Sequence, residues 1–101
     1  MSLSSLQWEF LQALSKLIEF AKSEGYKLTG GDLYATTGHI DGSQHYKRLA
    51  IDLNLFINNQ YKTDTESHRK LGEYWVTLHP LARWGGNFTR KDGNHYEFFE
   101  E

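Results

Sequence analysis

Two histidines and an aspartate in this chain have types and spacings that could hold a metal ion. His45 stands seven positions before Asp52 in the segment SQHYKRLAIDL, and His95 stands three positions after Asp92 in the segment DGNHYEF. Zinc in a hydrolase usually takes three ligands from histidine and carboxylate side chains and leaves a fourth position for water. The spacing alone is weak evidence, because strand-end histidines and solvated aspartates would give the same pattern.

Two predicted strands must position these residues. Apolar residues alternate from Leu49 to Phe56, which predicts a half-buried strand with Asp52 turned away from the apolar core. His45 lies just before this strand, and His95 begins a second predicted strand, HYEFF. If the two strands are neighbours, all three side chains converge on one groove. The sequence leaves that pairing open.

The remaining segments predict an α+β fold with a small antiparallel sheet and two or three flanking helices. One helix is indicated by an apolar stripe from Leu6 to Ala21, with Ser4 and Gln7 as a capping box and Trp8 in the core. A second helix is predicted in TDTESHRKLGEYWVTLHP, with Trp75 in the core and an end at Pro80. Further short strands are predicted at 26–29, at 60–62 and in RWGGNF.

Length and composition narrow the class of protein. With 101 residues, we expect one domain spanning residues 1–101, and a monomer. The 11 basic and 13 acidic residues give a formal charge of −2, which does not favour nucleic acid as a partner. There is no cysteine, so disulfides, thiolate zinc sites and a cysteine nucleophile are excluded. No segment has the roughly 20 apolar residues of a membrane span, so we expect synthesis in the cytoplasm without membrane insertion.

Several segments together resemble one family. SQHYKRLAIDLNLF resembles the Ser-x-His-x6-Asp signature of the M15-like zinc peptidases of peptidoglycan, which include D-alanyl-D-alanine carboxypeptidases, dipeptidases and phage L-alanyl-D-glutamate endolysins. LGEYW, RWGGNF and DGNHYEF resemble the rest of the pattern in the same order, and RLAIDLNLF and WGG are similar to the phage and prophage endolysin branch. The resemblance covers roughly residues 31–98. It implies that His45, Asp52 and His95 bind Zn²⁺ and that Asp92 is the general base.

The resemblance implies that the protein hydrolyses an amide bond in the peptidoglycan stem peptide. The bond that we expect first is L-alanyl-D-glutamate, as in the phage endolysins. The enzyme would then act on the cell wall after release from the cell. One alternative is a D-alanyl-D-alanine carboxypeptidase, which needs a cation for the free carboxylate; Lys47 and Arg48 are the nearest in sequence. Another is a zinc-binding module of phage origin with weakened or lost catalysis.

The chain departs from the family pattern at one position that bears on activity. Ala35 stands where the family ordinarily has an arginine that is thought to bind substrate or the polarised carbonyl oxygen, which argues for a weakened enzyme. Arg48, where many relatives have glycine, either supplies a positive charge to the catalytic site or is solvated. Trp84 is expected to pack rather than to stack on substrate. Three more histidines, His39, His68 and His79, are expected on the surface or in helices.

Overall fold

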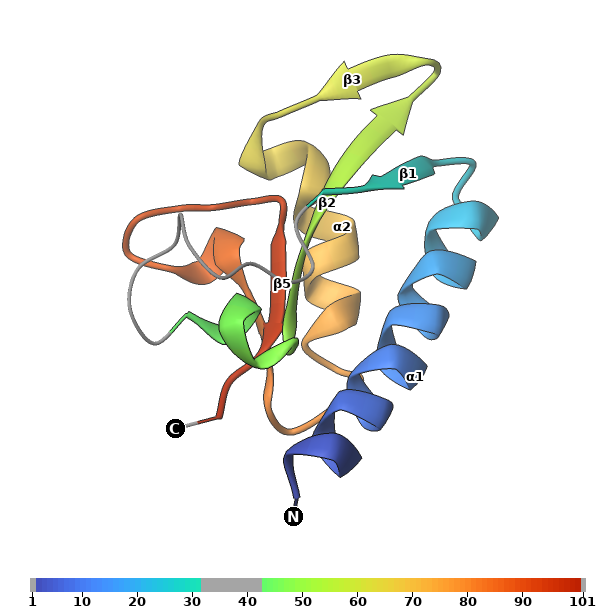
Figure 1. Cartoon of the computed structure of the whole chain (residues 1–101). Helices are drawn as coiled ribbons and strands as arrows, with labels where there is room; N and C mark the ends of the chain where they lie inside the picture. Colours follow the sequence, from blue (N-terminus) through green and yellow to red (C-terminus); the bar gives the residue numbers. More distant parts are fainter. Residues whose placement is uncertain (1, 32–42, 101) are drawn as a thin grey trace.

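The computed structural model describes residues 2–31 and 43–100, which form two α-helices and five strands (Figure 1). The helices are α1 (Leu3–Ser23) and α2 (Thr65–Trp75), and two short 3₁₀ helices are η1 (Gln44–Lys47) and η2 (Gly85–Asn87). The strands are β1 (Lys27–Gly30), β2 (Ala50–Ile57), β3 (Gln60–Lys62), β4 (Ala82–Trp84) and β5 (His95–Phe98). These elements confirm the predicted α+β class.

All strand pairs are antiparallel, and β2 is the centre of the sheet. The strand order is β1-β2-β5-β4, and β3 pairs with the end of β2 beyond β5. The hairpin from β2 to β3 turns at Asn58 and Asn59, whose φ angles of 52° and 63° are left-handed, as the Asn-Asn pair predicts. The last strand in the sequence is therefore inserted between β2 and β4.

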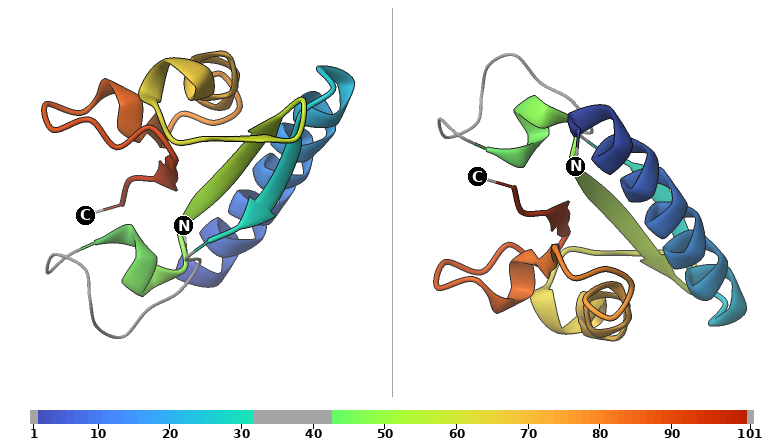
Figure 2. Two further views of the ribbon diagram at one scale, coloured as in Figure 1. Left: turned by 90° about the horizontal axis from the view of Figure 1, so that it is seen from above. Right: turned by 90° about the horizontal axis from the view of Figure 1, so that it is seen from below.

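Both helices cover the same face of the sheet. Phe10 of α1 makes edge-to-face contacts with Trp75 of α2 and with Phe98 of β5, and Trp75 also meets Tyr96. These residues belong to one buried cluster that includes Leu49, Ile51, Leu53 and Leu55 from the β2 segment. Figure 2 shows α1 alongside β1 and β2, with α2 nearer the C-terminal strands. The opposite sheet face carries the alternating polar residues of β2 and β5.

Helix α1 begins earlier than the capping pattern predicts. Its N-cap is Ser2, whose hydroxyl accepts a hydrogen bond from the Ser5 amide, so the prediction of Ser4 as the cap is wrong. Gln7 instead donates its side-chain amide to the carbonyl of Lys47, 2.9 Å away. Trp8 is 64% exposed, which corrects its expected place in the core. No helix in the described ranges is long and apolar enough to span a membrane.

Helix α2 contains a glycine for a packing reason. Asp64 caps the helix by accepting from the Ser67 amide, and the helix ends at Trp75, five residues before Pro80. A Cβ atom on Gly72 would lie 2.0 Å from Cδ2 of the Trp84 ring, and one on Gly86 would lie 2.2 Å from Cζ2 of the same ring. The two glycines therefore let Trp84 be fully buried, which confirms its packing role.

Candidate metal centre

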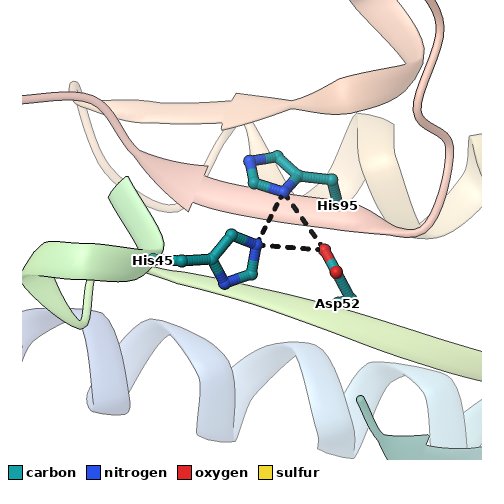
Figure 3. Close-up of side chains that lie close together, drawn as sticks. All are labelled: His45, Asp52 and His95. Atoms are coloured by element: carbon teal, nitrogen blue, oxygen red, sulfur yellow. Dashed lines mark hydrogen bonds and ion pairs between the residues drawn. The ribbon is translucent and has the colours of Figure 1, made fainter. Parts of the chain in front are cut away.

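Three separate segments bring His45, Asp52 and His95 together (Figure 3). His45 lies in η1, which starts at Ser43, where the serine hydroxyl accepts from the His45 amide. Asp52 and His95 lie opposite each other in the antiparallel pairing of β2 and β5. The two strands are therefore neighbours, which the sequence left open, and η1 brings His45 to the same face.

The three side chains present one atom each to a common point. His45 Nε2 lies 3.3 Å from Asp52 Oδ1 and 3.2 Å from His95 Nδ1, and His95 Nδ1 lies 3.2 Å from Asp52 Oδ1. Donor atoms bonded to zinc at about 2.0–2.1 Å in a tetrahedron are about 3.3 Å apart. The triangle thus has the edge length of one face of a tetrahedral zinc site.

Burial and charge at this triangle favour a bound cation. His45 and His95 are buried and Asp52 is half-buried. Burial would raise the pKa of Asp52, but hydrogen bonds and attraction from His45 and His95 outweigh it and hold that pKa well below its usual range. Burial also opposes protonation of His95, but Asp52 and Glu97 outweigh it and raise the pKa of His95 to about 9. The triangle is therefore an electron-rich centre that attracts a proton in the metal-free protein.

The chemistry of the donor set fits zinc. Two imidazole nitrogens and one carboxylate oxygen are ligands that Zn²⁺ takes, and three protein ligands leave a fourth coordination position. His45, Asp52 and His95 form a group in the described part of the chain whose potential ligand atoms all lie within 4.8 Å of one another. These residues would hold the ion.

Asp92 is placed by a tight turn that leads into β5. Its carbonyl oxygen accepts from the His95 amide at 3.1 Å, and its own amide donates to the Gly85 carbonyl at 3.0 Å. A Cβ atom on Gly85 would lie 2.0 Å from the Asp92 carbonyl oxygen, so only glycine allows this approach. Trp84 Nε1 donates to the Gly93 carbonyl at 2.7 Å. The WGG segment therefore fixes the turn between Asp92 and His95, and Asp92 itself is exposed. Its role as a base stays a prediction.

Glu97 is a site neighbour that the sequence reasoning missed. Its carboxylate Oε1 lies 2.7 Å from Nε2 of His95, on the side of the ring away from the triangle. The available signal was positional: in a strand, residues two apart share a face, so a carboxylate two residues after a predicted histidine ligand lies next to it.

The other candidate residues have varied environments. Arg48 is exposed, caps η1 with a left-handed φ of 57°, and keeps its catalytic role only as a prediction. His68 lies in α2 as expected but is fully buried, and its Nδ1 is 2.8 Å from the Tyr96 hydroxyl. His79 pairs with Glu9 at 2.8 Å. Ala35 and His39 lie outside the described residues.

Comparisons with known proteins identify the family and support the fold. The sequence matches the peptidase M15 family described as D-alanyl-D-alanine carboxypeptidase over residues 36–98, which is more than half of the chain. A search of curated proteins found no match. The crystal structure of the L-Ala D-Glu endopeptidase ChiX from Serratia marcescens is similar in fold, with a TM-score of 0.51 and 16% identity. That similarity covers 84% of this chain and 59% of ChiX, so the chain spans about three fifths of that protein. The chain belongs to the peptidase M15 family of D-alanyl-D-alanine carboxypeptidases and related peptidoglycan peptidases.

Proposed function

We propose that this chain is a zinc metallopeptidase that hydrolyses an amide bond in the peptidoglycan stem peptide. The observation that carries the proposal is the triangle of His45 Nε2, Asp52 Oδ1 and His95 Nδ1, with all edges between 3.2 and 3.3 Å. Membership of the peptidase family supports the substrate class. The fold of the triangle's surroundings, with one ligand each from η1, β2 and β5, suits a fixed site.

In this proposal each residue has a stated role. A zinc ion held by His45, Asp52 and His95 would supply Lewis acidity, which polarises the scissile carbonyl and makes a water molecule more acidic. Asp92 accepts the proton from the attacking water and returns it to the nitrogen of the leaving amine, so that the amide bond breaks with proton balance. Asp92 suits this role because it is exposed and is tied by its backbone to His95. Arg48 is proposed to supply positive charge to the substrate.

The scissile bond that we propose first is the one between L-alanine and D-glutamate. Two considerations support it: the endolysin-like segments of the sequence and the similar fold of ChiX, which is named an L-Ala D-Glu endopeptidase. The second candidate is removal of the terminal D-alanine, because the matching family is described as a carboxypeptidase. As an endolysin-type enzyme, the protein would act on the cell wall after release from the cell that makes it.

Mass spectrometry of a digested stem peptide distinguishes these activities. The zinc-loaded protein would be incubated with a pentapeptide stem that contains both the L-Ala–D-Glu bond and a D-Ala–D-Ala end. We expect cleavage after L-alanine, loss of cleavage with a chelator and return of cleavage with added zinc. Release of D-alanine alone would favour the carboxypeptidase. A protein that binds zinc but cleaves neither the peptide nor purified sacculi would contradict the enzyme proposal and favour the binding module.

A further inference from the structure

Glu97 is a buried acidic residue beside the metal-binding triangle. Its side chain is only 7% exposed, although it lies next to the C-terminus of β5. An isolated carboxylate at such a position would lose much of its hydration, which costs free energy unless it is paired and hydrogen-bonded. The partners of this carboxylate therefore indicate why an acid is there.

The two carboxylate oxygens have different partners. Oε1 lies 2.7 Å from His95 Nε2, and Oε2 lies 3.2 Å from Arg83 Nε across the β4–β5 pairing, where Arg83 is opposite Glu97. The Arg83 guanidinium is itself placed over the rings of Phe99, at 4.2 Å, and Phe88, at 5.1 Å. Arg83 thus forms an ion pair with one end of the carboxylate, at an oxygen that makes no hydrogen bond to a described residue, while the other end faces the histidine.

The strand geometry keeps Glu97 and His95 in contact. They are two residues apart on β5 and share a sheet face, and their partners on β2 are Ala50 and Asp52. Ala50 is small, so it leaves room for the Glu97 side chain beside it. On the opposite face, Trp75 Nε1 donates to the Glu97 carbonyl at 3.1 Å and fixes the backbone of the strand.

This arrangement determines which nitrogen of His95 faces the triangle. An ionised carboxylate only accepts hydrogen bonds, so His95 Nε2 must carry the proton in the contact with Glu97. In the neutral ring the lone pair then lies on Nδ1, the atom that is 3.2 Å from both His45 Nε2 and Asp52 Oδ1. A hydrogen bond to the second ring nitrogen is the usual way in which proteins orient a histidine ligand.

We propose that Glu97, held by Arg83, is a positioning residue that fixes the His95 ring with Nδ1 directed at the metal. The inference rests on the proposed metal site, and it adds a residue outside the ligand set. A purely structural Arg83–Glu97 ion pair would affect only stability. A positioning residue also affects the affinity for the metal and the protonation of His95 Nε2. Both quantities can be measured separately from catalysis.

The metal test compares Zn²⁺ affinity, by competition with a chromophoric chelator, in Glu97→Ala, Glu97→Gln and Glu9→Ala. Glu97→Ala should weaken zinc binding by about 10- to 100-fold, the usual effect of losing such a partner. Glu97→Gln should weaken it less, because an amide oxygen still accepts from Nε2–H. Glu9→Ala is the matched control, since it removes a carboxylate from another histidine, His79, and should leave zinc affinity unchanged.

Nuclear magnetic resonance of the metal-free protein supplies the second readout. Long-range ¹H–¹⁵N spectra, recorded above the raised pKa of His95 so that the ring is neutral, should show a proton on Nε2 and none on Nδ1 in the wild type. In Glu97→Ala they should show a mixture of the two tautomers. If Glu97→Ala does not fold, the wild-type spectrum and the zinc affinity of Glu97→Gln still test the positioning role of Glu97. Wild-type zinc affinity in Glu97→Ala, or an unprotonated Nε2 in the wild type, would overturn the proposal. A wild type that binds no zinc would instead contradict the proposed function, while the Nε2 proton would still report on Glu97.

Discussion

His45, Asp52 and His95 show how few residues are needed to form a candidate metal site. Each is unremarkable alone: a histidine in a short 3₁₀ helix, an aspartate on the polar face of a strand and a histidine at a strand start. Together they place three electron-pair donors within 3.3 Å of one another, and this arrangement favours the binding of a cation. Asp92 and Glu97 lie on either side of His95 in the sequence and divide the remaining roles, one proposed to move a proton and the other to orient the ring.

Replacing Asp92 by asparagine should separate catalysis from metal binding. Asparagine has the same size but cannot take a proton from water, so hydrolysis of stem peptide should fall by roughly 10²-fold or more. Because Asp92 is exposed and is not in the triangle, zinc content and thermal stability should stay near those of the wild type. Peptide turnover and elemental analysis on the same preparation check this. If the variant lost its zinc, Asp92 would be a ligand and not the base.

His68 predicts a pH dependence of stability that is separate from the metal centre. Burial lowers its pKa below the ordinary value of 6.5, with a smaller opposing effect from the Lys62 backbone and Asp64. The unfolded chain therefore takes up a proton near pH 6.5 that the folded chain does not, so folding stability falls as the pH drops below that value. The loss is limited to about 1.4 kcal/mol per pH unit.

Urea unfolding of the metal-free protein at pH 7.5 and pH 5 measures this effect. His68→Gln does not titrate and keeps a polar partner for the Tyr96 hydroxyl, so it should lose less stability than the wild type between the two pH values. Other titrating groups are common to both proteins and cancel in the difference. An equal loss in the two proteins would mean that His68 does not resist protonation when folded.

At the scale of elements, the site depends on the pairing of β2 with β5 and on the turn that precedes β5. Alternation of apolar residues predicted β2 and the outward direction of Asp52, because burial of one sheet face follows from a period of two. The pairing partner could not be predicted this way, since β5 inserts between β2 and β4 from the far end of the sequence. The start of α1 was misplaced because Ser2 and Ser4 are equally good caps.

Gly85→Ala should disturb the turn that carries Asp92 and His95. The added Cβ would lie 2.0 Å from the Asp92 carbonyl oxygen and 3.0 Å from the His95 Cβ, so the turn must shift. We expect a loss of roughly 1–3 kcal/mol in the free energy of unfolding, as for other overpacked sites, together with weaker zinc binding. Chemical denaturation and zinc competition measure the two effects.

Gly30→Ala is the control for this variant, because a Cβ at Gly30 has no atom within 4 Å. It should change stability by no more than about 0.5 kcal/mol and leave zinc binding intact. If Gly85→Ala behaved like Gly30→Ala in both measurements, the close packing of η2 against the turn would not matter to the site.

At the scale of the whole molecule, a core on one sheet face supports the candidate metal site on the other. The helices bury the apolar side chains of β2 and β5, while the alternate side chains of the same strands supply Asp52, His95 and Glu97. The remaining member of the triangle, His45, comes from η1. The family signature singled out the three residues that the fold brings together across 50 residues of sequence, from His45 to His95, and their role as ligands stays a prediction. It did not predict Glu97, whose position two residues after His95 on a strand is a local signal outside the ligand signature. The exposure of Trp8 depends on tertiary neighbours, which no local pattern encodes.

The central claim is that one zinc ion binds through His45, Asp52 and His95, and elemental analysis of the purified protein tests it most directly. After zinc loading and removal of free metal, the wild type and His79→Ala should each contain about one zinc per chain. His79 is the matched control, because it is a histidine paired with a carboxylate outside the triangle. His95→Ala should contain almost none, since two remaining ligands bind zinc weakly. Full zinc occupancy in His95→Ala would contradict the account.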